Sequence, residues 1–172
     1  MRAQALLAIA LAGTLVTSAT PAAAQGSGQP IQFQIRYQLA EELRFDVPLS
    51  DSPDHWLRAA RFVGEVSGDS RLAGAQAVEM GLHDAFPGRE ITGAPIYHVL
   101  TLTDGSQLTL RGDRRLVTVS TDGGAPVNVY TGTWQVLGGT GSAAGWRGAG
   151  TIRIRPISPQ EVVQEFEGTL VP

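Results

Sequence analysis

Strict alternation of apolar and polar side chains is the feature that most constrains this chain. From residue 31 to residue 39 the odd-numbered residues are apolar and the even-numbered ones are polar: Ile31, Phe33, Ile35, Tyr37 and Leu39 against Gln32, Gln34, Arg36 and Gln38. Because successive side chains of a β-strand point to opposite faces of the sheet, this pattern predicts a strand with one buried face. Shorter or weaker alternation predicts further strands at residues 45–49, 77–83, 96–103, 108–110, 116–121, 127–136, 151–155 and 162–170.

Glycine, proline, aspartate and serine join these segments. Asp104-Gly105 is typical of a tight hairpin turn, and residues 122–124 are expected to turn the chain again. Residues 51–60 predict one or two helical turns, with Pro53 at the first position, whereas residues 71–79 are expected to form a loop that leads into a strand. The resulting eight or nine strands favour one all-β domain, either a sandwich or a barrel. An antiparallel barrel has the advantage that its closure removes exposed strand edges.

The N-terminal segment has the pattern of a cleaved signal peptide. A positive start at Arg2 is followed by an apolar run over residues 5–12 and by an A-x-A cleavage site at residues 22–24. We therefore expect a signal peptide at 1–24, a flexible leader at 25–30 and the folded domain at 31–172, in a secreted or periplasmic protein. No later run of 18 apolar residues occurs, so no membrane insertion is expected after cleavage.

Composition excludes several classes of function. The chain contains no cysteine, which rules out disulfides, zinc–thiolate sites, iron–sulfur clusters and thiol catalysis. A net charge of −3 disfavours binding to nucleic acid, which needs clustered positive charge. The three histidines lack the spacing of a zinc motif, so no metal is expected. No G-x-S-x-G sequence is present for a serine hydrolase, and a Walker motif fails because the chain has no lysine.

A glycine-rich segment lies at residues 132–150 (GTWQVLGGTGSAAGWRGAG). Gly139, Gly141 and Ala144 formally match a loose dinucleotide fingerprint, but such a fingerprint must open a helix, and the glycines that follow are unfavourable inside one. No nucleotide cofactor is therefore expected. Glycines at this density instead indicate a β-bulge or a sharp barrel corner, where strands pass closely.

The same segment resembles one found in the allene oxide cyclase-like and dirigent-like barrel families. In those families a strand, a Gly-Gly-Thr-Gly turn and an Arg-Gly-x-Gly-Thr step into the next strand follow in this order, as they do here, although Ser142-Ala143 replaces a larger pair. The resemblance implies an eight-stranded antiparallel barrel whose apolar lumen holds a small hydrophobic molecule. It also implies assembly as homodimers or homotrimers and, in some members, cyclisation or radical coupling of a bound intermediate.

Four side chains are the first candidates for contact with a ligand in the lumen. Tyr37 and His98 fall on the alternating positions that are otherwise apolar in their strands. Trp134 and Tyr130 are the further candidates. Plain core packing is the alternative for each of them. No catalytic residue is identified. The carboxylates at 41–42, 65, 69, 165 and 167 are interpreted as solvated, Arg153 and Arg155 as outward-facing, and Arg111, Arg114 and Arg115 as crowding a hairpin end.

Three hypotheses about function remain open. The barrel binds a small hydrophobic compound, or it is a cyclase or stereo-directing isomerase without metal or nucleotide cofactor, or it is a module whose outer face binds a protein or a glycan. A cyclase requires a buried ionisable group with a perturbed pKa at the pocket. An interaction module predicts a filled core and a large apolar patch on the surface.

Overall fold

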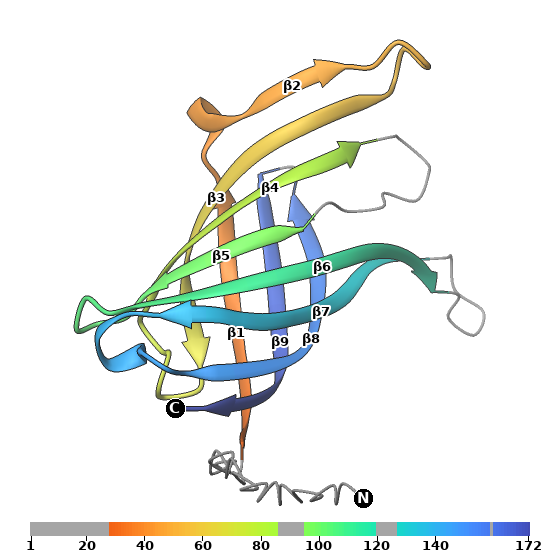
Figure 1. Cartoon of the computed structure of the whole chain (residues 1–172). Helices are drawn as coiled ribbons and strands as arrows, with labels where there is room; N and C mark the ends of the chain where they lie inside the picture. The colour runs from red at the N-terminus through yellow and green to blue at the C-terminus, as the bar shows by residue number, and fades with distance from the viewer. Residues whose placement is uncertain (1–27, 86–94, 120–126, 159) are drawn as a thin grey trace, which may run out of the picture.

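A computed structural model describes residues 28–85, 95–119, 127–158 and 160–172. Nine strands and two short 3-10 turns make up this part of the chain (Figure 1). In chain order these are β1 (Gln29–Leu39), η1 (Glu41–Leu43), β2 (Phe45–Pro48), β3 (Trp56–Gly68), β4 (Gln76–Ala85), β5 (Ile96–Thr101), β6 (Gln107–Val119), β7 (Val127–Gly139), η2 (Gly141–Ala143), β8 (Arg147–Ser158) and β9 (Glu161–Val171). Neither described helix is long and apolar enough to cross a membrane.

Eight of the strands close into an antiparallel barrel. Their order around it is β1-β9-β8-β7-β6-β5-β4-β3, and β1 closes the ring by pairing with β3, from Phe33 opposite Gly68 to Leu39 opposite Phe62. The ninth strand, β2, pairs with the first residues of β3, and the two together extend above the closed ring (Figure 1). The all-β, eight-stranded antiparallel barrel predicted from the sequence is confirmed.

Three aromatic rings pack against one another in the interior. Phe33 and Phe166 are stacked with their centroids 4.5 Å apart, and Trp134 meets Phe33 edge-on at 6.1 Å. Side chains from three turns, Leu72, Leu102 and Ala143, are buried in the same core and close this end of the barrel. Burial of this many apolar side chains supplies the main driving force for folding a chain without disulfides.

The glycine-rich segment forms the expected corner. In β7 a bulge at Leu137 shifts the register against β6, just before the Gly138-Gly139 pair. The chain then turns through Gly141, whose φ of +57° favours glycine, and enters β8. Farther along, a Cβ on Gly150 would lie 1.8 Å from the carbonyl oxygen of Glu167, so only glycine lets β8 and β9 approach this closely.

Several assignments differ from the expectations, and β7 and β8 are longer than predicted. The predicted helix at 51–60 is wrong: after a turn the chain enters β3 at Trp56, because this segment pairs with β2 on one side and β4 on the other. The strands expected at 108–110 and 116–121 are one strand, β6. β1 begins at Gln29, inside the segment expected to be a leader. The predicted signal peptide and the turn at 122–124 lie outside the described residues.

Candidate functional site

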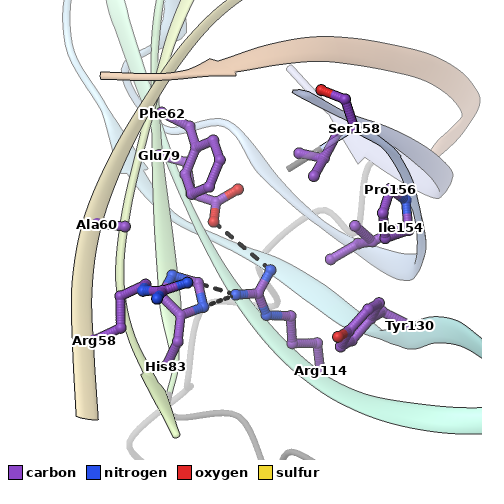
Figure 2. Close-up of a pocket in the computed structure, with 11 residues that line it drawn as sticks. Arg58, Ala60, Phe62, Glu79, His83, Arg114, Tyr130, Ile154, Pro156 and Ser158 are labelled. Atoms are coloured by element: carbon purple, nitrogen blue, oxygen red, sulfur yellow. Dashed lines mark hydrogen bonds and ion pairs between the residues drawn. The ribbon is translucent and has the colours of Figure 1, made fainter. Parts of the chain in front are cut away.

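A cavity of about 260 Å³ lies at the end of the barrel away from the three aromatic rings. Figure 2 shows the side chains that line it. Its apolar wall comes from β3, β7, β8 and β9 and comprises Ala60, Phe62, Tyr130, Ile154, Pro156 and Val162. Its polar groups come from β3, β4, β6 and β8 and comprise Arg58, Glu79, His83, Arg114 and Ser158. An apolar pocket with a few converging polar groups is the usual form of a small-molecule site.

Glu79 is the central acidic group of the cavity. It is fully buried, with Oε1 lying 3.7 Å from Nη1 of Arg114, and Gln164 donates a hydrogen bond from Nε2 to Oε2. Burial raises the pKa of this carboxyl group, and the charge of Arg114 and the hydrogen bond from Gln164 offset part of that rise. Glu79 is therefore a buried carboxylate that takes up a proton more easily than an exposed one.

Arg114 reaches across the cavity from β6 and links Glu79 to His83. Figure 2 shows its guanidinium between these two side chains of β4, with Nη2 donating to Nδ1 of His83. Burial, and then the charges of Arg114 and Arg58, lower the pKa of His83 to about 3. His83 is thus a neutral acceptor at ordinary pH, and the positive charge in this group belongs to Arg114.

Arg58 stands at the rim of the cavity and is held by β2. Its Nε and Nη2 donate to the two carboxylate oxygens of Asp46 at 2.7 and 3.0 Å. The hydrogen bonds from Arg58 and Arg44 hold the pKa of Asp46 far below its ordinary range. The strand outside the closed barrel therefore has a role at the site, because its carboxylate orients and neutralises Arg58.

Beneath the cavity a hydrogen bond joins two strands on opposite sides of the barrel. The hydroxyl group of Tyr37 in β1 lies 3.0 Å from Nδ1 of His98 in β5, and both residues are fully buried. Burial, with a smaller contribution from Glu79, raises the pKa of Tyr37 well above its ordinary value of about 10. Burial and the charge of Arg114 lower the pKa of His98 to about 3. Both groups are consequently neutral. Together with the Gln164–Glu79 bond they form a polar layer between the cavity and the aromatic rings.

The four residues named from the sequence lie in three environments. Tyr37 and His98 are brought together in the polar layer, and Tyr130 lines the cavity. Trp134 packs instead with Phe33 and Phe166 and donates from Nε1 to the carbonyl oxygen of Glu167 at 3.1 Å.

The sequence reasoning missed Glu79 and the inward position of Arg114. In residues 77–83 the alternation of the apolar Val78, Met80 and Leu82 indicates that their face is buried. In the structure Met80 and Leu82 are exposed, and Ala77 and Glu79 on the other face are buried. Residues 107–119 form one strand, in which Arg114 lies on the same face as the buried Leu108 and Leu110. Treating these residues as one strand from the start would have predicted that Arg114 points inward. In the described part of the chain no cluster of histidine, aspartate and glutamate has the geometry to hold a metal ion.

The class of protein follows from strand order and closure. It is a closed eight-stranded antiparallel β-barrel with a cavity at one end. Among solved structures, the chain is similar to that of the pterocarpan synthase dirigent protein, with 11% sequence identity and a TM-score of 0.47, over 84% of this chain and 86% of that one. That likeness is one of fold. No protein-family model matches the sequence, and no curated protein matches it.

Proposed function

We propose that this barrel binds a small, largely apolar molecule in the cavity at its end. The observation that carries the proposal is the combination of an apolar wall with one buried, ion-paired carboxylate, Glu79, inside a space of about 260 Å³. Apolar surface favours uptake of a hydrophobic compound from water, and a few fixed polar groups orient it.

The volume limits the size of the molecule. At roughly 30 Å³ for each water-sized unit, the cavity has room for roughly nine non-hydrogen atoms. That is below the usual range of about 300–1,000 Å³ for pockets that hold drug-sized ligands. A compound with about eight carbon atoms is therefore a suitable first probe.

Filling the cavity tests the proposal. Ala60 is buried and lines the cavity, so Ala60→Leu places three more carbon atoms inside it. The neighbouring Ala59 belongs to the outer face of the same strand, and Ala59→Leu is the matched control. We expect 1-methoxyheptane to bind the unmodified protein and the control alike, and Ala60→Leu at least about tenfold more weakly, by calorimetric titration.

Two results would count against binding in the cavity. The first is that neither 1-methoxyheptane nor its isomer octan-1-ol binds any of the three proteins, and the second is that 1-methoxyheptane binds all three equally. Mass spectrometry of compounds extracted from protein purified from its native host is an independent test, and we expect it to find an apolar compound of similar size.

A cyclase or stereo-directing isomerase is the second candidate function. It is favoured by a specific observation, the buried Glu79 with its raised pKa in the cavity wall. In this case the barrel holds a reactive polyunsaturated or phenolic intermediate in one shape, and proximity supplies much of the effect. We expect the protein to bias the stereochemistry with which phenolic radicals couple when an added one-electron oxidant generates them, measured by chiral chromatography, and Glu79→Gln to lose that bias. Products identical with and without the protein would refute this function.

An outer interaction surface is the third candidate. Met80, Leu82 and Tyr97 on neighbouring strands β4 and β5 are 56%, 48% and 42% exposed and form an apolar group on one outer face. Such a face suits a second copy of the chain. We expect sedimentation equilibrium to give a homodimer or homotrimer that Met80→Lys dissociates. A monomer at every concentration would exclude self-association.

A further inference from the structure

We propose that the molecule bound in the cavity carries a neutral hydroxyl group, which donates a hydrogen bond to Oε1 of Glu79. This inference rests on the proposed binding function and adds to it the chemical class of the ligand, an apolar alcohol.

The first argument is the unmatched oxygen of Glu79. Oε2 of this carboxylate accepts a hydrogen bond from Gln164, but Oε1 has no hydrogen-bond partner although it is buried. The guanidinium of Arg114 lies 3.7 Å from it, which is an ion pair beyond hydrogen-bonding distance. A buried polar atom without a partner is unfavourable, and the great majority of such atoms in proteins are hydrogen-bonded. Glu79 lines the cavity, and the proposed hydroxyl group would supply the missing partner of this atom.

Two further unmatched atoms belong to the same polar layer. They are Oε1 of Gln164, whose amide is bonded to Glu79, and Nε2 of His98, the residue paired in register with Glu79 on the next strand. When the hydroxyl group of Tyr37 donates to Nδ1 of His98, the neutral imidazole carries its proton on Nε2. The layer therefore holds two unmatched acceptors and one unmatched donor, and of its residues Glu79 is the one that lines the cavity.

Charge selects against the ionic alternatives. A carboxylate on the ligand has no proton to donate to Oε1 of Glu79, and the charge of Glu79 would repel it. An ammonium group would place a second cation beside Arg114, whose charge Glu79 already balances. Burying a charge without a partner is strongly unfavourable, so the head group that fits is a neutral donor.

Four probes with an eight-carbon skeleton test the head group. Octan-1-ol and 1-methoxyheptane are isomers with nine non-hydrogen atoms, but only the alcohol donates a hydrogen bond. Octanoate and octylammonium carry the two charges. We expect calorimetric titration to give binding of the alcohol about tenfold tighter than binding of the ether, as a hydrogen bond to a carboxylate provides, with both ions weaker than the alcohol.

A variant pair locates the acceptor. Glu79→Met removes the carboxylate at similar length and should abolish the preference for alcohol over ether while binding of the ether persists. Glu65→Met makes the same change on the exposed outer face of β3 and should leave the preference intact. If Glu79→Met does not fold, the comparison of alcohol with ether in the unmodified protein still decides the question.

The results separate the two proposals. Equal binding of alcohol and ether, tightest binding of either ion, or a preference for alcohol that survives in Glu79→Met would each overturn the hydroxyl inference and leave the cavity as a binding site. Absence of binding by all four probes would instead count against the binding function itself.

Discussion

The ion pair between Glu79 and Arg114 yields the most direct prediction about stability. The side chains are 1% and 12% exposed, and they lie on different strands, β4 and β6. Replacing Arg114 by methionine keeps much of the length of the side chain and removes its charge. Glu79 would then be buried with only the hydrogen bond from Gln164 to support its negative charge.

The magnitude follows from burial and depends on pH. Removing one partner of a buried ion pair typically costs about 3–5 kcal/mol. Arg114 lowers the pKa of Glu79, so its loss raises that pKa further above the unfolded value of about 4.5. A group with a raised native pKa stabilises the fold below its unfolded pKa, and that contribution is lost as pH rises, at about 1.4 kcal/mol per pH unit. Arg114→Met should therefore be most destabilising at pH 8 and least at pH 5.

Urea unfolding of four proteins at these two pH values measures the effect. The proteins are the unmodified chain, Arg114→Met, Glu79→Met and the double variant, and we expect the double variant at pH 8 to be more stable than the sum of the single losses implies. A loss below about 1 kcal/mol at pH 8, the same loss at both pH values, or simple additivity would refute the reasoning.

Three further predictions concern packing, acid stability and processing. Gly150→Ala should lower the free energy of unfolding by several kcal/mol, because its Cβ would lie 1.8 Å from a facing carbonyl oxygen. At Gly138 an added Cβ meets nothing within 4 Å, so Gly138→Ala should change the free energy of unfolding by less than about 1 kcal/mol. Equal thermal shifts in the two variants would contradict this. His83 and His98 have native pKa values of about 3, against 6.5 in the unfolded chain. The free energy of unfolding should therefore be retained above pH 6.5 and fall below it, by up to about 2.7 kcal/mol per pH unit for the two groups together. A urea midpoint that stays constant from pH 7 to pH 4 would contradict this. N-terminal sequencing of protein from the medium or periplasm should begin at Gln25, and an uncleaved chain would exclude the predicted signal peptide.

Much of the barrel follows from local sequence. In β1 every apolar residue from Ile31 to Tyr37 is buried and every polar one between them is exposed, as the alternation predicts. The inward position of Tyr37 and His98 follows from the same parity, since a strand fixes which side chains share a face. The glycine-rich corner is local as well, because positive φ angles and close strand contacts select glycine regardless of distant partners.

The extent of the strands was decided by tertiary pairing. Residues 56–60 have the beginning of a helical pattern, yet they lie between β2 and β4, and the hydrogen bonds of two neighbouring strands outweigh a weak local preference. In β6 a run of glycine and charged residues, 111–115, separates two apolar segments, but pairing with β7 continues through it.

The cavity was also beyond the reach of the sequence. The alternation of apolar residues predicts which face of a strand is inside only where the interior is apolar. Here Glu79 and Arg114 point inward, and each balances the charge of the other although they lie 35 residues apart in the chain. Alternation by itself determined that this chain forms strands with one buried face. Only closure of the sheet, which sets residues distant in sequence against each other in a medium without water, decided that the buried face would end in a charged and partly open site.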